Sequence, residues 1–229
     1  MPGAAADRLA RHTVPGAIIA LSQVTWPARA GAAARRALGR RGRVELYFAF
    51  DDAASAVAVL DLAGRTAGRD VRLLLLPVVH RGIPDDPAAD AKRRYAIVDA
   101  VRLARRSGLA LARTEPLAAA DTAFLAEWTA AGPAGPALNR FCVAALRRLW
   151  LETAGPPDRE EYAALWREHL GSEPPANGAG AVRRAERRMR RRGPYDTPAA
   201  WIHGQWFFAH DRRVQIGERL DDLGWKAAA

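Results

Sequence analysis

Two dense runs of apolar residues stand out in the first half of the chain. Residues 44–50 read VELYFAF and residues 71–79 read VRLLLLPVV, and both compositions predict buried strands. Between them, apolar positions at 57, 59, 60 and 62 predict a helix from about residue 53 to residue 67. Strand, helix and strand in such close succession predict a βαβ unit with parallel strands and a right-handed crossover.

The segment from residue 84 to residue 180 is predicted to be almost entirely helical. Its apolar residues recur at helical spacing in four pieces, and glycine and proline residues separate the pieces. The expected helices cover residues 90–107, 117–130, 137–153 and 159–170. A loop rich in proline and glycine follows, and residues 181–192 then predict a helix with arginine on most of its circumference.

Residues 197–212 (TPAAWIHGQWFFAHDR) predict a β-hairpin near the C-terminus. Pro198 opens an apolar strand, His203-Gly204 supplies a two-residue turn, and the partner strand returns over residues 206–208. A last helix is expected from Asp211 to about residue 223. This order resembles the end of a thioredoxin-like domain, and the resemblance implies a cis peptide bond before the proline.

The net charge of +10 is concentrated in two places. Residues 1–43 hold eight Arg and one Asp, and residues 183–192 hold seven Arg and one Glu, so the rest of the chain carries −3. The first segment, with helices expected at 4–21 and 28–38, is interpreted as an extension that packs by its apolar side. An arm for nucleic acid or an anionic membrane is the alternative. The arginine helix at 183–192 is expected to be a solvated face.

The single cysteine, Cys142, excludes an intrachain disulfide and a Cys-x-x-Cys redox pair. It lies in an apolar run and is expected to be buried and inert. The five histidines are scattered and lack cysteine partners, so no metal site is expected. No apolar stretch approaches the roughly 20 residues that span a bilayer, and the run at 14–21 is short for a signal peptide. A cytoplasmic, soluble protein is expected.

Several motifs resemble those of the DsbA-like family, which includes 2-hydroxychromene-2-carboxylate isomerases and kappa-class glutathione transferases. When Pro198 is aligned with the proline of the family's C-terminal motif, four further residues match the motif: Gly204, Phe207, Asp211 and Arg212. The pattern of the first helix of the insertion is matched by Lys92, Tyr95, Asp99, Arg102, Arg105, Arg106, Gly108 and Leu109. The resemblance covers roughly residues 43–225.

The resemblance implies an α/β architecture: a thioredoxin-like fold with an inserted all-helical domain and a basic helical extension at the N-terminus. The extension is residues 1–43. The thioredoxin-like domain is residues 44–83 and 181–229, and the helical insertion is residues 84–180.

The resemblance also implies a site where the first helix of the thioredoxin-like domain begins. The family's reactive Ser or Cys is replaced by Asp52, a carboxylate that would raise the pKa of a bound thiol. Asp52 is interpreted as a helix cap, as a catalytic general base, or as both, and Ser55 is the alternative hydroxyl donor. Thr197 and Pro198 would clamp a ligand's backbone.

Further residues complete this expected site. His210 and Asp211 would meet the ligand's amino-acid end, and Asp211 is also expected to cap the last helix. His80 lies at the C-terminal edge of a parallel strand, the usual rim of sites in α/β sheets, and is a further candidate. The insertion is expected to cover the site with an apolar roof.

Two functions follow from these expectations. The first is an isomerase or transferase that uses glutathione or another low-molecular-weight thiol, or that acts directly on an unsaturated or aromatic acid. The second is a catalytically inactive thioredoxin-like binding module. The expected partner is a small-molecule substrate, a homodimer is left open, and neither nucleic acid nor a membrane is expected.

Overall fold

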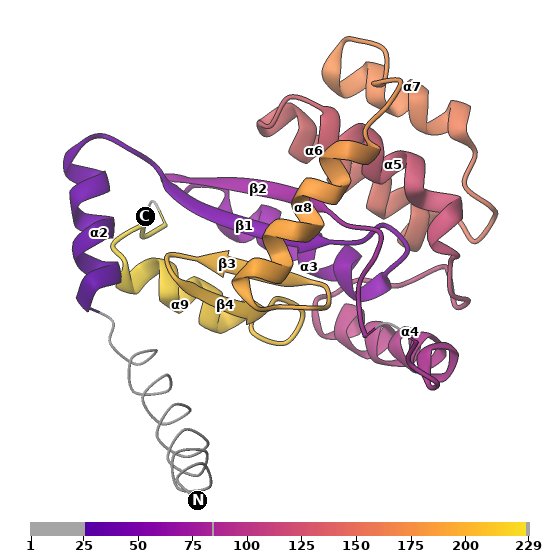
Figure 1. The fold of residues 1–229 in the computed structure, drawn as a ribbon, viewed down its shortest axis with the longest axis horizontal. Coiled ribbons are helices and arrows are strands. Elements are labelled where there is room, and N and C mark those ends of the chain that lie inside the picture. Colours follow the sequence, from indigo (N-terminus) through magenta and orange to yellow (C-terminus); the bar gives the residue numbers. More distant parts are fainter. Residues whose placement is uncertain (1–25, 84, 228–229) are drawn as a thin grey trace, which may run out of the picture.

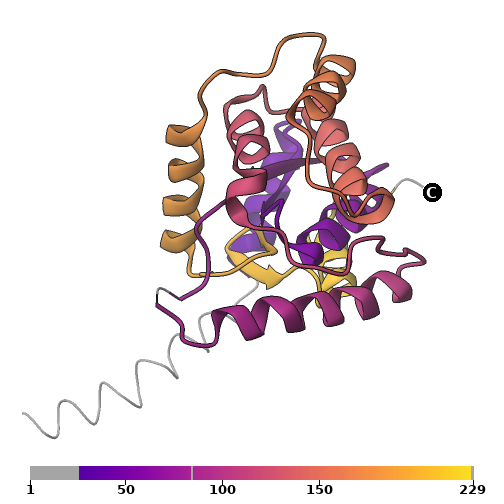
Figure 2. The ribbon, with the colours of Figure 1, turned by 90° about the vertical axis from the view of Figure 1, so that its right-hand side faces the viewer.

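The chain folds around a four-stranded mixed sheet with helices on both faces and a helical layer at one end (Figures 1 and 2). The computed structural model describes residues 26–83 and 85–227. The elements run in the order α2 (Trp26–Ala37), β1 (Gly42–Phe48), α3 (Ala53–Thr66), β2 (Val71–Pro77), α4 (Ala89–Arg106), α5 (Ala119–Ala131), α6 (Pro136–Arg147), the π-helix η1 (Arg148–Glu152), α7 (Arg159–Leu170), α8 (Ala179–Arg192), β3 (Ala199–Ile202), β4 (Gln205–Phe208) and α9 (Arg213–Asp222).

The sheet has the strand order β2-β1-β3-β4. Strands β1 and β2 pair in parallel over their whole length, from Gly42 opposite Val71 to Phe48 opposite Pro77. Strand β3 runs antiparallel to β1, and β4 runs antiparallel to β3. The predicted βαβ unit and the predicted hairpin are therefore confirmed, and they meet at the β1–β3 pair.

The hairpin turn and the bond before it agree with the sequence. His203 and Gly204 both have positive φ, +44° and +89°, as a tight two-residue hairpin turn requires. The peptide bond between Thr197 and Pro198 is cis, as predicted. The expected helix at 4–21 lies outside the described residues.

Strand β1 is buried on both sides, which its almost uninterrupted apolar sequence predicts. Side chains alternate along a strand, so Leu46 and Phe48 join the large core on the side of α3 and α9. Tyr47 and Ala49 join a smaller cluster with α8, which also holds Met189. The sheet therefore separates two apolar layers, and β1 is the element that both layers share.

Helix α8 is attached to the sheet by charge as well as by apolar contact. The carboxylate of Glu45, only 2% exposed, accepts hydrogen bonds from Arg188 and from Arg192 at 2.6 Å, and Arg43 pairs with it at 2.9 Å. The other five arginines of this helix are exposed: Arg183, Arg184, Arg187, Arg190 and Arg191. The prediction of a solvated face therefore holds for five arginines and is wrong for two, because a buried glutamate on β1 holds them.

The helical segment differs from its prediction at one point. Residues 137–153 were expected to form one helix, but the α-helix ends at Arg147 and a π-helical turn covers Arg148–Glu152. This turn carries Trp150, whose ring is fully buried and whose Nε1 donates to the carbonyl of Phe50 at 2.9 Å. The helical layer is thereby linked to the loop between β1 and α3.

Helix α2 packs beside the C-terminal end of the chain (Figure 1). Arg36 donates to the carbonyl of Leu223 and lies over the ring of Trp225 at 5.8 Å. Arg29 pairs with Asp222 at 3.5 Å. The predicted helix at 28–38 is thus present and packs on the domain. Among the described helices, none is both long and apolar enough to cross a membrane.

Candidate functional site

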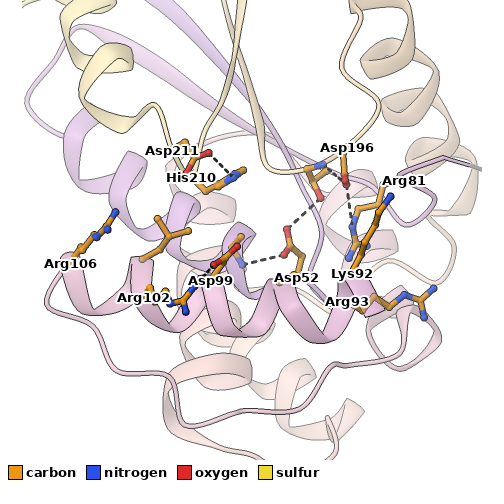
Figure 3. A pocket seen from close by; sticks show the side chains of 14 residues that line it. Asp52, Arg81, Lys92, Arg93, Asp99, Arg102, Arg106, Asp196, His210 and Asp211 are labelled. Atoms are coloured by element: carbon orange, nitrogen blue, oxygen red, sulfur yellow. Dashed lines mark hydrogen bonds and ion pairs between the residues drawn. The ribbon is translucent and has the colours of Figure 1, made fainter. Parts of the chain in front are cut away.

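A cavity of about 500 Å³ opens where β1 and β2 end, between the start of α3, the segment before β3, and one side of α4 (Figure 3). The cavity therefore lies at the carboxyl edge of the parallel strands, the usual place for ligands in such sheets. Its described lining residues are Asp52, Ala54, Arg81, Lys92, Arg93, Ala96, Asp99, Arg102, Leu103, Arg106, Asp196, Thr197, His210 and Asp211.

Asp52 is the N-cap of α3 and faces the cavity (Figure 3). Its carboxylate accepts the backbone N–H groups of Ala54 and Ser55, both at 3.1 Å, and the Ser55 hydroxyl at 2.6 Å. The hydroxyl of Thr197 lies 3.5 Å from the same carboxylate. The predicted cap is confirmed, and the cap side chain is also the group that lies between α3 and the cis-proline segment.

Burial raises the pKa of Asp52 above its ordinary value. The positive charge of Arg81 and the hydrogen bond from Ser55 act in the opposite direction but do not cancel the effect of burial. A carboxyl group with a raised pKa accepts and returns protons more readily near neutral pH than an exposed one. The cap is therefore also the strongest candidate for acid–base chemistry in this cavity.

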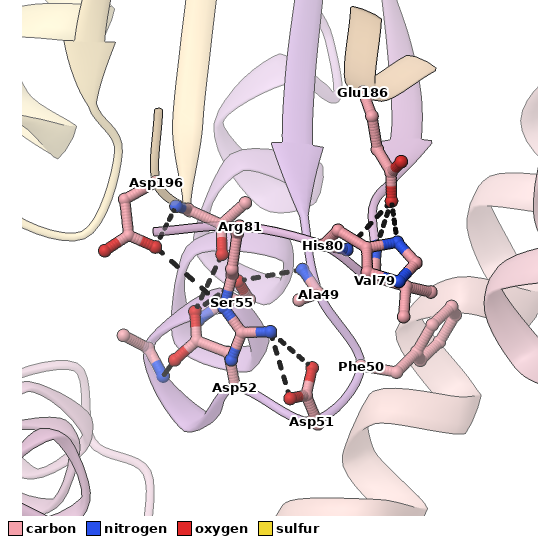
Figure 4. Close-up of polar contacts among 12 residues, drawn as sticks. Ala49, Phe50, Asp51, Asp52, Ser55, Val79, His80, Arg81, Glu186 and Asp196 are labelled. Atoms are coloured by element: carbon pink, nitrogen blue, oxygen red, sulfur yellow. Dashed lines mark hydrogen bonds and ion pairs between the residues drawn. The ribbon is translucent and has the colours of Figure 1, made fainter. Parts of the chain in front are cut away.

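Arg81 supplies a positive charge that acts on Asp52. Its guanidinium donates to both carboxylate oxygens of Asp51, at 2.7 and 2.9 Å, and lies 3.9 Å from the carboxylate of Asp196 (Figure 4). Burial opposes the charge of Arg81, but Asp51 and Asp52 outweigh burial and raise its pKa. Arg81 therefore stays charged and links the loops that follow β1 and β2.

The loop that carries Arg81 is held from α8. One carboxylate oxygen of Glu186 accepts the backbone N–H of Val79 at 3.1 Å and that of His80 at 2.8 Å (Figure 4). The Nδ1 atom of His80 lies 3.1 Å from the same oxygen. His80 is not among the lining residues of the cavity, so its role is to help fix the loop.

One side of α4 forms a charged wall of the cavity (Figure 3). The charged residues Lys92, Arg93, Asp99, Arg102 and Arg106 line the cavity together with Ala96 and Leu103, and this spacing places all seven on one face of the helix. From residue 92 to residue 106 the face is about 21 Å long, at about 1.5 Å per residue. The apolar roof predicted for the insertion is therefore wrong. The reason is that α4 turns its polar face to the cavity and packs by buried residues such as Ile97, Ala100 and Ala104.

Most of these cations already have acidic neighbours. Lys92 pairs with Asp86 at 2.5 Å, and Arg102 pairs with Asp99 at 3.0 Å. Arg106 is exposed, and no residue in the described ranges forms a hydrogen bond or ion pair with its side chain. This end of the cavity therefore has the least compensated positive charge.

Ser55 does not line the cavity. Its side chain is fully buried, and its hydroxyl accepts the backbone N–H of Ala49 at 3.1 Å while it donates to Asp52. Because the hydroxyl already accepts one hydrogen bond and donates another within the loop, Ser55 positions Asp52 and is not placed to meet a ligand.

His210 and Asp211 both reach the cavity, opposite α4 (Figure 3). Nε2 of His210 lies 3.3 Å from a carboxylate oxygen of Asp211. The predicted cap is wrong, however, because α9 begins at Arg213, its N-cap residue is Arg212, and no side chain caps it. Asp211 lies one residue too early in the chain to cap this helix, and its carboxylate faces His210 instead.

The expected thiol fits these residues poorly. A carboxylate stands where a thiolate would need stabilisation, and the backbone N–H of Thr197 already donates to the side chain of Asp196 at 2.8 Å. As to metals, no cluster of three or more His, Cys, Asp or Glu residues able to hold an ion occurs in the described part of the chain.

Several solved structures share the fold. The chain aligns with a 2-hydroxychromene-2-carboxylate isomerase at a TM-score of 0.64 and 17% identity, over 79% of this chain and 95% of the other. It aligns with a probable DsbA oxidoreductase from Streptomyces coelicolor at a TM-score of 0.57 and 17% identity, over 82% and 93%. No protein-family model and no curated protein sequence matches the chain. The molecule therefore has the DsbA-like thioredoxin fold, and the structural likeness extends no further than the fold.

Sequence reasoning missed the residues that surround Asp52 on the cavity wall. Arg81 and Asp196 carry no local signal, because their pairing depends on two loops that meet only in the folded chain. The wall of α4 did carry a signal: polar residues at 92, 99, 102 and 106 recur at helical spacing. That signal was used for the family resemblance and not for the site.

Proposed function

We propose that this protein is an isomerase that moves a proton on an unsaturated or aromatic acid held in the Asp52 cavity. The observation that carries the proposal is a buried carboxyl group with a raised pKa at the start of α3, facing a cavity beside the cis-proline segment. Asp52 would take a proton from one carbon of the conjugated acid and return one to another carbon. The reaction needs no oxidant, reductant or co-substrate, because one proton is removed and one is returned while the electron pairs stay within the substrate.

The charged wall of α4 supports an acidic substrate. Arg106 at one end of the cavity can meet a carboxylate, since no described residue neutralises it. Asp99 and Asp211 also line the cavity and limit how much negative charge the ligand can carry. A small acid with its carboxylate near Arg106 and its conjugated body toward Asp52 suits this distribution.

The proposed reaction does not use glutathione or another low-molecular-weight thiol. The Asp52 carboxylate would raise the pKa of a bound thiol, and the Thr197 N–H that would bind a tripeptide backbone is engaged by Asp196. A direct isomerisation is therefore preferred over a thiol transfer. The sign of the charge at position 52 is the reason for this choice.

One observation favours a second function, that of a binding module without catalysis. The carboxylate of Asp52 already accepts two backbone N–H groups and one hydroxyl, so its conformation is explained by the cap alone. In that case the cavity would bind an acidic ligand and release it unchanged.

Incubation with a panel of unsaturated and aromatic acids in D₂O, followed by proton NMR, tests the proposal. We expect isomerisation or exchange of a carbon-bound proton with at least one acid, at the same rate with and without glutathione. The Arg106→Gln variant should raise KM with little change in kcat. The Arg105→Gln variant, an exposed neighbour outside the cavity, is the matched control and should leave KM unchanged. Binding without any exchange would support the second function, and a strict need for thiol would refute the proposal.

A further inference from the structure

A second cavity lies along the outer edge of β2, at the opposite end of α3 from Asp52. It has a volume of about 910 Å³, larger than the Asp52 cavity, and the two share no lining residue. Helix α3 contributes Ala63, Thr66 and Ala67 to it, from its C-terminal end and the residue that follows. Its volume falls in the range of about 300–1,000 Å³ typical of small-molecule sites. The cavity is therefore separate from the site described above.

The floor of this second cavity is apolar. Strand β2 contributes Val71 and Leu73, and α6 contributes Val143 and Ala144. Val71 and Leu73 are mostly buried, at 9% and 6% exposure, and Val143 and Ala144 are partly exposed. Asn139 partly closes the edge, donating from its side chain to the carbonyl of Leu73 at 3.0 Å. What remains is a groove that can bury an apolar chain beside the strand.

The charged and titratable side chains described at the groove are all Arg or His. Arg41, Arg72, Arg140, Arg147 and His169 line it, and no Asp or Glu does so among the residues with described positions. An apolar floor surrounded by charge of one sign calls for a ligand with an apolar body and an opposite charge at its end.

Part of this positive charge is uncompensated. Arg41 pairs with Asp70 at 3.1 Å, and Arg72 donates to the carbonyl of Ala134 at 2.9 Å. Arg140 is exposed, and within the described ranges its side chain has neither a hydrogen bond nor an ion pair. Arg140 is therefore the guanidinium most available to an incoming anion.

We propose that this groove binds a single-chain anionic amphiphile, a medium- to long-chain carboxylate, with its chain over Leu73 and Val143 and its carboxylate at Arg140. Charge complementarity selects this ligand, since a neutral lipid would leave the rim unused and a hydrophilic polyanion would leave the floor exposed. A second copy of the chain is disfavoured, because a two-fold contact would place arginine against arginine. The inference does not depend on the function proposed for Asp52.

Isothermal titration of the full chain with octanoate, decanoate and laurate, each below its micellar concentration, tests the site. We expect one saturable site with an affinity that rises about fourfold per added methylene until the groove is filled. Decanol should bind more weakly than decanoate, and decyltrimethylammonium more weakly still. Arg140→Gln should weaken decanoate about fivefold and leave decanol unchanged. Arg187→Gln, on the exposed face of α8 outside both cavities, is the matched control and should have no effect.

A second set of variants separates this groove from the acid site at Asp52. Val143→Asp, checked for folding by thermal unfolding, should abolish decanoate binding, and Arg106→Gln should leave it unchanged. The proposal is overturned if Arg106→Gln weakens decanoate, if Arg187→Gln weakens it as much as Arg140→Gln, or if the cationic amphiphile binds as well as the anionic one. Sedimentation that reveals a dimer broken by Val143→Asp would assign the groove to a second copy and would equally overturn it.

Discussion

Replacing Glu45 by glutamine would remove one buried negative charge that three arginines share. Glu45 lies on β1, and its side chain is only 2% exposed, whereas Arg188 and Arg192 on α8 keep 33% and 24% of their side-chain surface in water. Tyr47 donates a further hydrogen bond to this carboxylate at 3.0 Å. The substitution keeps the shape of the side chain and removes the charge that holds α8 to the sheet.

The expected cost follows from the burial of the partners. Breaking a buried ion pair by removing one partner costs about 3–5 kcal/mol, because the remaining charge stays buried and unpaired. Here the arginines can turn partly into water, so we expect about 2–4 kcal/mol for Glu45→Gln, reduced from the buried value by solvent screening. Arg192 lies 4.7 Å over the ring of Trp201, and this contact would persist. The loss remains a large part of a typical stability of about 5–15 kcal/mol.

Urea unfolding followed by tryptophan fluorescence measures this cost. Arg187→Gln, which neutralises an exposed arginine of the same helix, is the control and should change stability by less than about 0.5 kcal/mol. The double variant of Glu45→Gln with Arg192→Gln should be less destabilised than the sum of its single variants. A cost below about 1 kcal/mol for Glu45→Gln, with no coupling to Arg192, would refute the argument that charge fixes α8.

Two further predictions concern the interior. Trp150→Phe should destabilise the protein by about 2–4 kcal/mol in urea unfolding, because it removes the hydrogen bond to the carbonyl of Phe50 and leaves a void in the core. A cost near zero would show that the π-helical turn does not support the loop after β1. Burial raises the pKa of Cys142 to about 12, so its thiol should not react with Ellman's reagent in the native state at pH 8, should react fully in denaturant, and should give no insulin reduction. Rapid native labelling would contradict the buried placement of this residue.

Local patterns predicted most of the fold. Strands β1 and β2, helix α7 and the hairpin with its His203-Gly204 turn lie where apolar periodicity and turn residues indicate, because neighbouring residues determine these features. The helical segment was divided correctly except at the π-helical turn. Nothing in residues 148–152 themselves signals that turn, and its carbonyls and Trp150 make long-range contacts.

The site was only partly predictable for a related reason. Asp52 was found because a cap and an aligned motif are both local features of the sequence. The bond between Arg81 and Asp51, and the approach of α4 to the cavity, join segments that are brought together only by the sheet and by the packing of α3 on α4. The alignment placed Asp211 at the start of the last helix, where it would cap that helix. The helix begins two residues later, at Arg213, so Asp211 does not cap it.

The central claim is that Asp52 transfers a proton and does more than cap α3. The most direct measurement is kcat of Asp52→Asn and Asp52→Ala with the acid that the NMR panel identifies, together with the stability of both variants. Because asparagine caps a helix about as well as aspartate, Asp52→Asn should keep the stability within about 0.5 kcal/mol, whereas Asp52→Ala should lose about 1 kcal/mol. We predict that both variants lose about 10²–10⁴-fold in kcat. Unchanged turnover in Asp52→Asn would contradict the account and leave Asp52 as a cap alone.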